Sequence, residues 1–174
     1  MIHGEFKFCP TCGHALENRV AELEHKERPV CPSCGFIHYD NPTPAAGVIV
    51  FVDDRLLLVK RKYKPKVGMW TLPAGFVETG EDAAECAVRE AKEETNLDVE
   101  VVRLFGVYSA FDDPRAAVVL ILYHCKKVGG TLECGDDASD SGFFELDNLP
   151  EDIAFRAHRR AIADIKKAFA DGNL

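Results

Sequence analysis

The chain has 174 residues, of which 47% are hydrophobic, so it can bury one good core and a small appendage. Its formal net charge of −8 argues against passive binding to nucleic acids or anionic membranes. No stretch is apolar over the length of a membrane span, and the first residues lack the apolar core of a signal peptide. We therefore expect a cytoplasmic protein with no membrane partner.

Two pairs of cysteines near the N-terminus have the CxxC spacing of metal knuckles. The pairs are Cys9 with Cys12 and Cys31 with Cys34, and 18 residues separate them. Four thiolates at this spacing are typical of one structural Zn²⁺; iron and disulfides are the alternatives, and the missing export signal argues against disulfides. We expect residues 1–40 to form a zinc ribbon that needs its metal to fold. The remaining cysteines are expected in the core: Cys86, Cys125 and Cys134.

Strands and helices are expected from residue 45 to residue 174. The two prolines of residues 41–44 predict a rigid connector ahead of them. Strands are predicted at 46–52, 56–61, 99–108 and 116–126, a turn at 53–54, a short strand from 143, and helices at 82–95 and 153–170. The pattern indicates an α/β fold in which helices cover a mixed sheet, with the strand at 116–126 central.

The helix predicted at 82–95 carries carboxylates on its apolar side. At about 100° per residue, Glu94 lies about 20° and Glu90 about 60° from Ala87, which is the centre of an alanine stripe. Arg89 lies on the opposite, solvated face, and no basic residue shares the face of the two glutamates. Burying carboxylates unpaired is strongly destabilising, so a metal ion or a distant basic residue should meet them. A buried or half-exposed structural carboxylate is the alternative.

The spacing of residues 75–97, GFVETGEDAAECAVREAKEETNL, resembles the Nudix box. The matching positions are Gly75, Glu81, Arg89, Glu90, Glu93, Glu94 and Leu97. Asn96 stands where the family usually has glycine; it follows the helix end and should adopt a left-handed conformation, which asparagine tolerates. The resemblance implies a Nudix α/β/α sandwich over residues 45–174 and hydrolysis of nucleoside diphosphates linked to another group.

The resemblance and the helix geometry together indicate the metal ligands. Glu90 and Glu94 lie one turn apart and are expected to hold Mg²⁺ or Mn²⁺ between them. Glu93 should bind a second ion or a ligated water, and by resemblance the carbonyl of Gly75 is a further ligand. Arg89 is expected to orient a box glutamate. Glu93, Glu94 and Arg89 are therefore the expected catalytic residues.

Further acidic residues have two readings each. Glu81 is expected either to support the box loop or to join the metal ligands. The general base comes, in this family, from the box or from a downstream acidic loop. Asp137 and Asp140 lie in such a loop here, and the alternative for each is a solvated position.

Four candidates for substrate contacts lie outside the box. Arg115 could bind a terminal phosphate or a ribose edge, unless it is an exposed loop arginine. Phe155 and Tyr108 could stack on a nucleobase, although isolated aromatics are more often core residues. His158 could contact phosphate, but we expect it on an exposed helix face.

The segment CGFIHYDNPTPAAGVIV, which joins the ribbon to the next strand, resembles the bacterial NADH pyrophosphatase branch. The Ser-Gln-Pro-Trp-Pro-Phe-Pro segment of those enzymes is absent, and GVYSAFDDPR is more similar to ADP-ribose pyrophosphatases. We therefore expect a nucleotide substrate, with ADP-ribose ahead of NADH and FAD. The alternatives are a nucleic-acid-binding or ligand-sensing Nudix module and an enzyme that decaps NAD-capped RNA. A homodimer is also among the expectations.

Overall fold

The computed structural model describes residues 6–20, 25–113, 117–135 and 137–174, which fall into two compact units divided in the chain between Pro42 and Thr43. The first unit contains a small antiparallel sheet of β1 (Glu17–Val20) and β2 (Glu27–Val30), with Glu17 opposite Val30. Bridges between Phe8 and Ala15 and between Val30 and Ile37 close the two cysteine turns. Little of this unit is apolar and buried apart from Cys9, Val30 and Cys31, so its order depends on the cysteine cluster.

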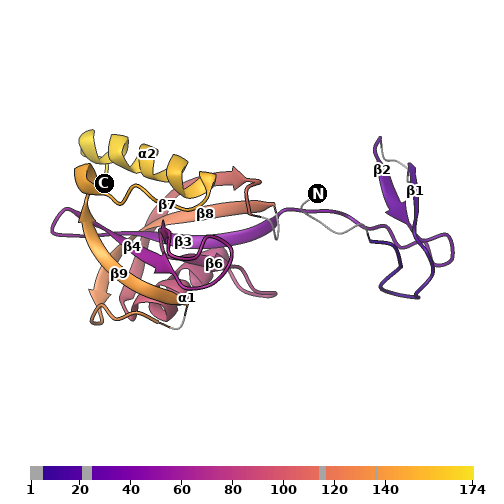
Figure 1. The fold of residues 1–174 in the computed structure, drawn as a ribbon, viewed down its shortest axis with the longest axis horizontal. Coiled ribbons are helices and arrows are strands. Elements are labelled where there is room, and N and C mark those ends of the chain that lie inside the picture. Colours follow the sequence, from indigo (N-terminus) through magenta and orange to yellow (C-terminus); the bar gives the residue numbers. More distant parts are fainter. Residues whose placement is uncertain (1–5, 21–24, 114–116, 136) are drawn as a thin grey trace. The chain divides into compact units, whose positions relative to one another are not determined.

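The second unit is built on one mixed sheet (Figure 1). Its strands run in the order β5 (Trp70–Thr71), β4 (Arg55–Arg61), β3 (Thr43–Val52), β8 (Val118–Gly129) and β7 (Asp98–Ala110). In addition, β6 (Ala74–Phe76) pairs with β3, and β9 (Ala138–Glu145) pairs with β4. The β3–β8 pair is parallel and the others are antiparallel. The mixed sheet is confirmed; β8 lies inside the sheet, between β3 and β7, whereas the middle strand of this order is β3.

The two helices cover opposite faces of this sheet, as Figure 1 shows. The alternation along β3 explains why both faces need a cover. Ala45 and Ile49 pack in the cluster of α2 (Arg156–Ala170), whereas Val48 and Val50 pack in the cluster of α1 (Ala83–Thr95). A short 3₁₀ helix, η1 (Leu146–Asn148), precedes α2. The predicted α/β/α sandwich is therefore confirmed.

Three predicted boundaries were wrong, two of them because long-range strand pairing moved them. The expected connector already belongs to β3, since the Thr43 amide donates to the Ala117 carbonyl at 2.8 Å and the strand runs along β8. β9 begins at Ala138 within the expected acidic loop, because it pairs with β4. α2 begins at Arg156 and not at 153, because Phe155 has φ 53° and ψ 141°, which are not helical angles. The predicted turn at Asp53–Asp54 is confirmed.

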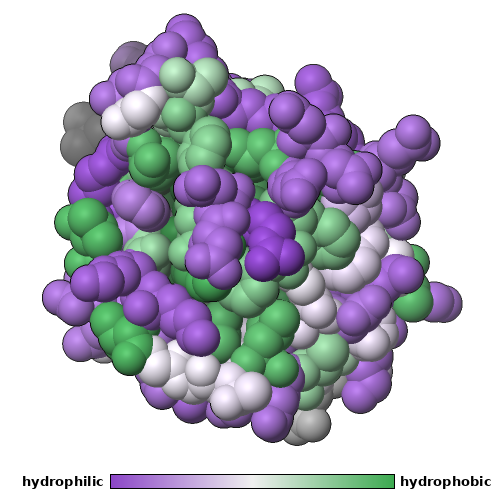
Figure 2. Space-filling view, turned by 90° about the vertical axis from the view of Figure 1, so that its left-hand side faces the viewer, coloured by the Kyte–Doolittle hydropathy of each residue, from purple (hydrophilic) through white to green (hydrophobic). Residues whose placement is uncertain are grey.

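Hydrophilic side chains cover most of the face that carries the β3–β4 turn, with hydrophobic ones visible between them (Figure 2). Among the described residues, no helix has the length and apolarity needed to cross a membrane. Cys86 and Cys125 are buried as predicted, but Cys134 is exposed. The prediction for Cys134 was wrong because residues 131–135 run along the surface of the unit.

Candidate active site

The helix α1 begins and ends with local capping interactions. At its start, the Asp82 carboxylate accepts a hydrogen bond from the Ala84 amide at 2.8 Å, and Glu85 accepts one from the Asp82 amide at 3.4 Å. This is a capping box, which satisfies the free amides of the first turn. At its end, Asn96 has φ 57° and ψ 12°, so the predicted left-handed conformation is confirmed. These caps hold the glutamates of α1 at defined heights along the helix.

Gly75 lies in β6, directly against the carboxylate of Glu90. A Cβ atom built on Gly75 would lie 2.0 Å from Glu90 Oε1 and 2.1 Å from its Cδ. Any side chain at this position would therefore displace the carboxylate. Close approach of backbone and carboxylate explains why glycine is needed here, and it places the Gly75 backbone beside Glu90.

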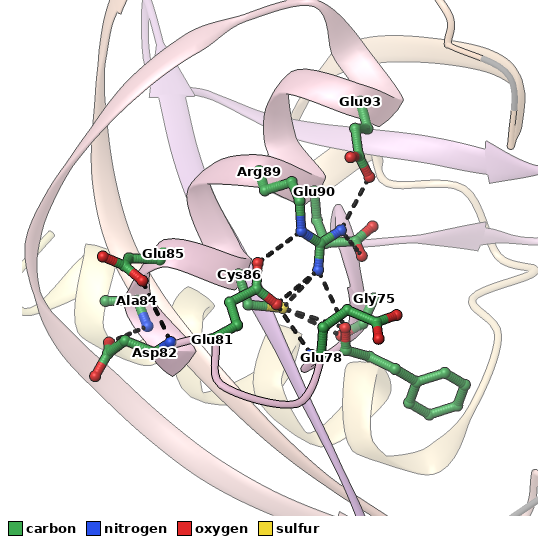
Figure 3. Close-up of polar contacts among 11 residues, drawn as sticks. Gly75, Glu78, Glu81, Asp82, Ala84, Glu85, Cys86, Arg89, Glu90 and Glu93 are labelled. Atoms are coloured by element: carbon green, nitrogen blue, oxygen red, sulfur yellow. Dashed lines mark hydrogen bonds and ion pairs between the residues drawn. The ribbon is translucent and has the colours of Figure 1, made fainter.

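Arg89 is the centre of a charged network (Figure 3). Its Nε and Nη2 donate to the two oxygens of Glu81 at 2.6 and 2.9 Å. Its Nη1 donates to Glu90 at 2.7 Å and to Glu93 at 2.9 Å, and Nη2 also donates to the Phe76 carbonyl at 3.2 Å. The expectation of a solvated face for Arg89 was wrong, because its long side chain bends back over the glutamates. Arg89 thus orients three carboxylates at once.

Glu81 supports the loop that precedes the helix. Besides its two hydrogen bonds from Arg89, it accepts one from the Glu78 amide at 3.0 Å. The hydrogen bonds from Arg89 and from that amide lower the pKa of Glu81 to about 2. The structure therefore favours the reading in which Glu81 supports the box loop, because both of its carboxylate oxygens already accept hydrogen bonds from Arg89.

Glu94 and Glu90 are the carboxylates with raised pKa values. Glu94 accepts a hydrogen bond from the Ala74 amide at 3.0 Å. Burial, followed by the neighbouring charge of Glu90, raises the pKa of Glu94 to about 8. Burial also raises the pKa of Glu90, and Arg89 only partly opposes this. Clustered, partly buried carboxylates of this kind are an arrangement that a divalent cation would stabilise, so the donors fit Mg²⁺ or Mn²⁺.

A cleft opens beside these carboxylates, between the end of β4 and the start of the box. Glu90, Glu94 and Asp137 line this cleft. Lys60, Arg61 and Lys64 line it as well, together with Tyr63. Acidic groups that can hold a cation therefore share a cleft with basic groups that can hold phosphate oxygens.

The basic residues of the cleft were not among the predicted site residues. The signal was present in the sequence, because residues 60–66, KRKYKPK, contain five basic groups in a chain of net charge −8. Their position in the same cleft as the α1 glutamates follows only from the pairing of β4 with β5 and β9. The Arg61 side chain is held in place by donating from Nε to the Pro65 carbonyl at 2.9 Å.

The predicted acidic loop residues separate in the structure. Asp137 lines the cleft with Glu90 and Glu94. Gly135 brings this segment close, because its amide donates to the Glu94 carbonyl at 3.1 Å. Asp140 lies exposed on β9, opposite Lys60 in register, and is not among the residues that line the cleft.

The predicted substrate contacts also separate. Phe155 is 8% exposed and lines a second pocket, together with His158. The expectation of an exposed helix face for His158 was wrong, because α2 packs that side against the sheet. Tyr108 is buried and its hydroxyl donates to Asp164 at 3.0 Å, which supports the core reading. Arg115 lies outside the described residues.

The four cysteines of the first unit converge on one point. Their Sγ atoms all lie within 4.8 Å of one another, with Sγ–Sγ distances of 3.6 Å for Cys9–Cys34 and 3.5 Å for Cys12–Cys31 and Cys12–Cys34. A tetrahedral ion with metal–sulfur bonds of about 2.3 Å separates its ligands by about 3.8 Å, whereas a disulfide needs about 2.05 Å. The cysteines are free thiols, and their geometry fits one four-coordinate metal ion.

Both units match known protein families. Residues 41–165 match the NUDIX domain, and residues 7–40 match the family described as Nudix N-terminal. The first match covers most of the chain and contains all the carboxylates of the cleft. The second contains the four clustered cysteines.

Three similar proteins illustrate the match. An ADP-ribose pyrophosphatase of Methanocaldococcus jannaschii is 46% identical over 127 residues, which are 72% of this chain and 74% of that protein. The NAD-capped RNA hydrolase NudC of Vibrio atlanticus is 35% identical over 93% of this chain, which spans only 60% of that relative's length. The crystal structure of a NUDIX hydrolase from Nitrosomonas europaea is 35% identical, with a TM-score of 0.84 over 95% of this chain and 93% of that one.

Proposed function

Because the chain belongs to the Nudix family, we propose that it is a pyrophosphohydrolase that cleaves the diphosphate bridge of a nucleoside diphosphate derivative. The observation that carries this proposal is the cleft that Glu90, Glu94 and Asp137 line together with Lys60, Arg61 and Lys64. A diphosphate bridge carries negative charge that the basic residues would bind, and its cleavage requires the kind of cation that the acidic residues would hold.

Glu90, Glu93, Glu94 and the carbonyl of Gly75 are the proposed ligands of Mg²⁺ or Mn²⁺. When bound, such an ion neutralises phosphate charge and lowers the pKa of a coordinated water. The raised pKa values of Glu90 and Glu94 and the contact of Gly75 with Glu90 support this set. Glu93 is more exposed and turns toward Arg89, so it is the ligand with the greatest freedom to move.

The remaining residues of the cleft have distinct proposed roles. Arg89 acts as a positioning residue, because it orients Glu81, Glu90 and Glu93 by charged hydrogen bonds. Lys60, Arg61 and Lys64 are proposed to bind the phosphate oxygens. Asp137 is a better candidate for the general base than Asp140, because only Asp137 lines the cleft.

The substrate that we propose is ADP-ribose, ahead of NADH and FAD. The support is the similarity to the M. jannaschii ADP-ribose pyrophosphatase and the absence of the proline-rich NADH segment from the sequence. The test is a side-by-side measurement of kcat/KM for the three compounds at one Mg²⁺ concentration, read by phosphate release after phosphatase coupling. A tenfold preference for NADH or FAD would overturn the order, and failure to cleave any of them would overturn the substrate class.

Decapping of NAD-capped RNA is the second candidate function. It is favoured by the V. atlanticus NudC, which matches this chain over both units. The same assay with a short NAD-capped RNA decides between the two, since a kcat/KM for capped RNA well above that for free dinucleotides would favour decapping.

We further propose that the ion of the first unit is Zn²⁺ in a structural role. Four thiolates complete a tetrahedral shell and leave no position for a substrate. Reduced cysteines of this kind are also expected of a cytoplasmic protein, which is the location that we propose.

A further inference from the structure

Residues 131–135, which lie between β8 and β9, run along the last turn of α1. Two of their amides donate to carbonyls at the end of that helix, from Glu133 to Thr95 at 3.1 Å and from Gly135 to Glu94 at 3.1 Å. The last carbonyls of a helix have no partners inside it, so this segment satisfies groups that would otherwise need water. We call residues 131–135 the docking segment.

Asn96 adds a side-chain contact to the docking segment. It is the position at which the chain departs from the Nudix box, where the family usually has glycine. Its Nδ2 donates to the Thr131 carbonyl at 3.2 Å, which a glycine could not do. Asn96 therefore ends α1 in the left-handed conformation and also binds the start of the docking segment.

Gly135 lies directly on the backbone of α1. A Cβ atom built on it would lie 1.6 Å from the carbonyl oxygen of Glu93, 2.8 Å from its carbonyl carbon and 3.3 Å from the Cα of Glu94. These are backbone atoms of a packed helix, so no side-chain rotation could relieve the contact. The φ angle of Gly135 lies outside the left-handed region, so lack of space, and not backbone conformation, requires glycine here. A side chain at this position would lift the docking segment off the helix.

The docking segment leads to Asp137, the proposed general base, which is held on its other side by β4. The Asp137 carbonyl accepts a hydrogen bond from the Lys62 amide at 3.1 Å. β9 then begins at Ala138, which lies opposite Arg61 in register. Because this second anchor does not depend on α1, release of the docking segment should displace Asp137 and leave β9 paired.

The docked segment places the charge of Asp137 beside the glutamates of α1. Gly135 and Asp137 line one groove together with Glu90, Glu93 and Glu94. Besides burial and the charge of Glu90, the charge of Asp137 raises the pKa of Glu94. The same negative charge would attract a cation bound by these glutamates. Displacement of Asp137 should therefore weaken the binding of a divalent cation as well as slow the reaction.

We propose that Gly135 and Asn96 are positioning residues, which dock residues 131–135 on α1 and thereby hold Asp137 beside the metal ligands. This inference rests on the proposed function, in which Asp137 is the general base. In Gly135→Ala, a separation of 1.6 Å must open to the 3.4 Å of ordinary contact, so the segment should move by about 1.8 Å.

The experiment is a double-mutant cycle on the full chain, with ADP-ribose at saturating Mg²⁺. Gly135→Ala and Asn96→Gly are each made alone and together with Asp137→Asn. Gly135→Ala should lower kcat about 100-fold, because a general base is misplaced, and Asn96→Gly, which loses one hydrogen bond, about fivefold. In the Asp137→Asn background each should lower kcat by less than about twofold, because the residue that they position is already disabled.

An equally large loss of kcat with and without Asp137→Asn would overturn the proposal, because Gly135 would then act on the helix and not through Asp137. An unchanged kcat in Gly135→Ala or in Asp137→Asn would do the same. If Gly135→Ala does not fold, Asn96→Gly decides by the same comparison. Glycine suits the left-handed angles at this position, so that variant keeps the end of α1 intact.

Gly142→Ala is the matched control for an added methyl group. It lies in β9, and its Cβ atom would meet the flexible ring of Phe144 at 3.2 Å. Its kcat should stay within about threefold of wild type, and the Asp137→Asn background should not change that ratio.

A titration with Mn²⁺ alone, read by calorimetry, separates this proposal from the proposed function. Gly135→Ala and Asp137→Asn should each weaken Mn²⁺ binding by about threefold or more, and the double variant should bind as Asp137→Asn does. If wild type hydrolyses none of the diphosphates, the proposed function fails and this titration decides the docking: additive losses overturn it, and the expected pattern supports it. If wild type hydrolyses ADP-ribose but the losses of kcat are additive, only the positioning role is refuted.

Discussion

Replacing Gly75 with alanine is expected to displace the Glu90 carboxylate and to abolish most activity. The new Cβ would lie 2.0 Å from Glu90 Oε1, whereas ordinary contact begins at 3.4 Å. One of the two groups must therefore move by about 1.4 Å. The backbone of Gly75 is held by the pairing of β6 with β3, so the carboxylate is the group that moves. Its hydrogen bond from Arg89, at 2.7 Å, would be lost with it.

The expected magnitude follows from the size of this displacement. A misplacement of about 1 Å at a reacting centre can cost about 100-fold in rate, so we expect turnover to fall by about 100-fold or more. Overpacking of this kind costs about 1–3 kcal/mol in the free energy of unfolding, so the variant should remain folded. The assay is the initial rate of ADP-ribose hydrolysis over a range of Mg²⁺ concentrations, with a thermal unfolding curve for each protein.

Gly142→Ala is the matched control, because a Cβ atom there would lie 3.2 Å from the flexible ring of Phe144. Its turnover should stay within about threefold of wild type, since a ring can move by a few tenths of an ångström. If Gly75→Ala also keeps its turnover within that range at every Mg²⁺ concentration, the placement of Glu90 against Gly75 does not matter for catalysis and the reasoning is wrong.

Three further predictions concern the metal ligands and His158. Glu94→Gln keeps the shape of the side chain but removes its charge, so turnover at saturating Mg²⁺ should fall about 100-fold or more. The variant should still unfold cooperatively. Near-normal turnover would exclude Glu94 as a metal ligand. Metal analysis of the purified chain should find about one zinc per molecule. A disulfide between two of the clustered cysteines would contradict the zinc site, and so would the absence of both zinc and iron. Burial and the charges of Arg61 and Arg159, opposed by Asp112, lower the pKa of His158 to about 4. In the unfolded chain this histidine takes up a proton near pH 6.5, so the free energy of unfolding of the wild type should fall by up to about 3 kcal/mol between pH 6.5 and pH 4. In denaturant titrations, the free energy of unfolding of His158→Leu should lack this contribution to the pH dependence. The same slope of unfolding free energy against pH in both proteins would refute the prediction.

Features that depend on near neighbours in the chain could be predicted from the sequence. The capping of α1 by Asp82 and the left-handed Asn96 involve residues a few positions apart, and their geometry follows from the helix itself. The CxxC knuckles are local in the same sense, because each turn is closed by its own backbone hydrogen bonds. The spacing of Gly75, Glu90 and Glu94 likewise predicted a site that needs no knowledge of the remaining chain.

The tertiary structure decided which distant groups face these glutamates. Lys60, Arg61 and Lys64 reach the cleft only because β4 pairs with β5 and β9, and no periodicity in the sequence encodes that pairing. His158 looked exposed because its neighbours Arg159 and Arg160 are charged, yet the packing of α2 on the sheet buries it. Burial of a polar group depends on contacts between elements far apart in the chain, so the burial of His158 could not be predicted from its neighbours in the sequence.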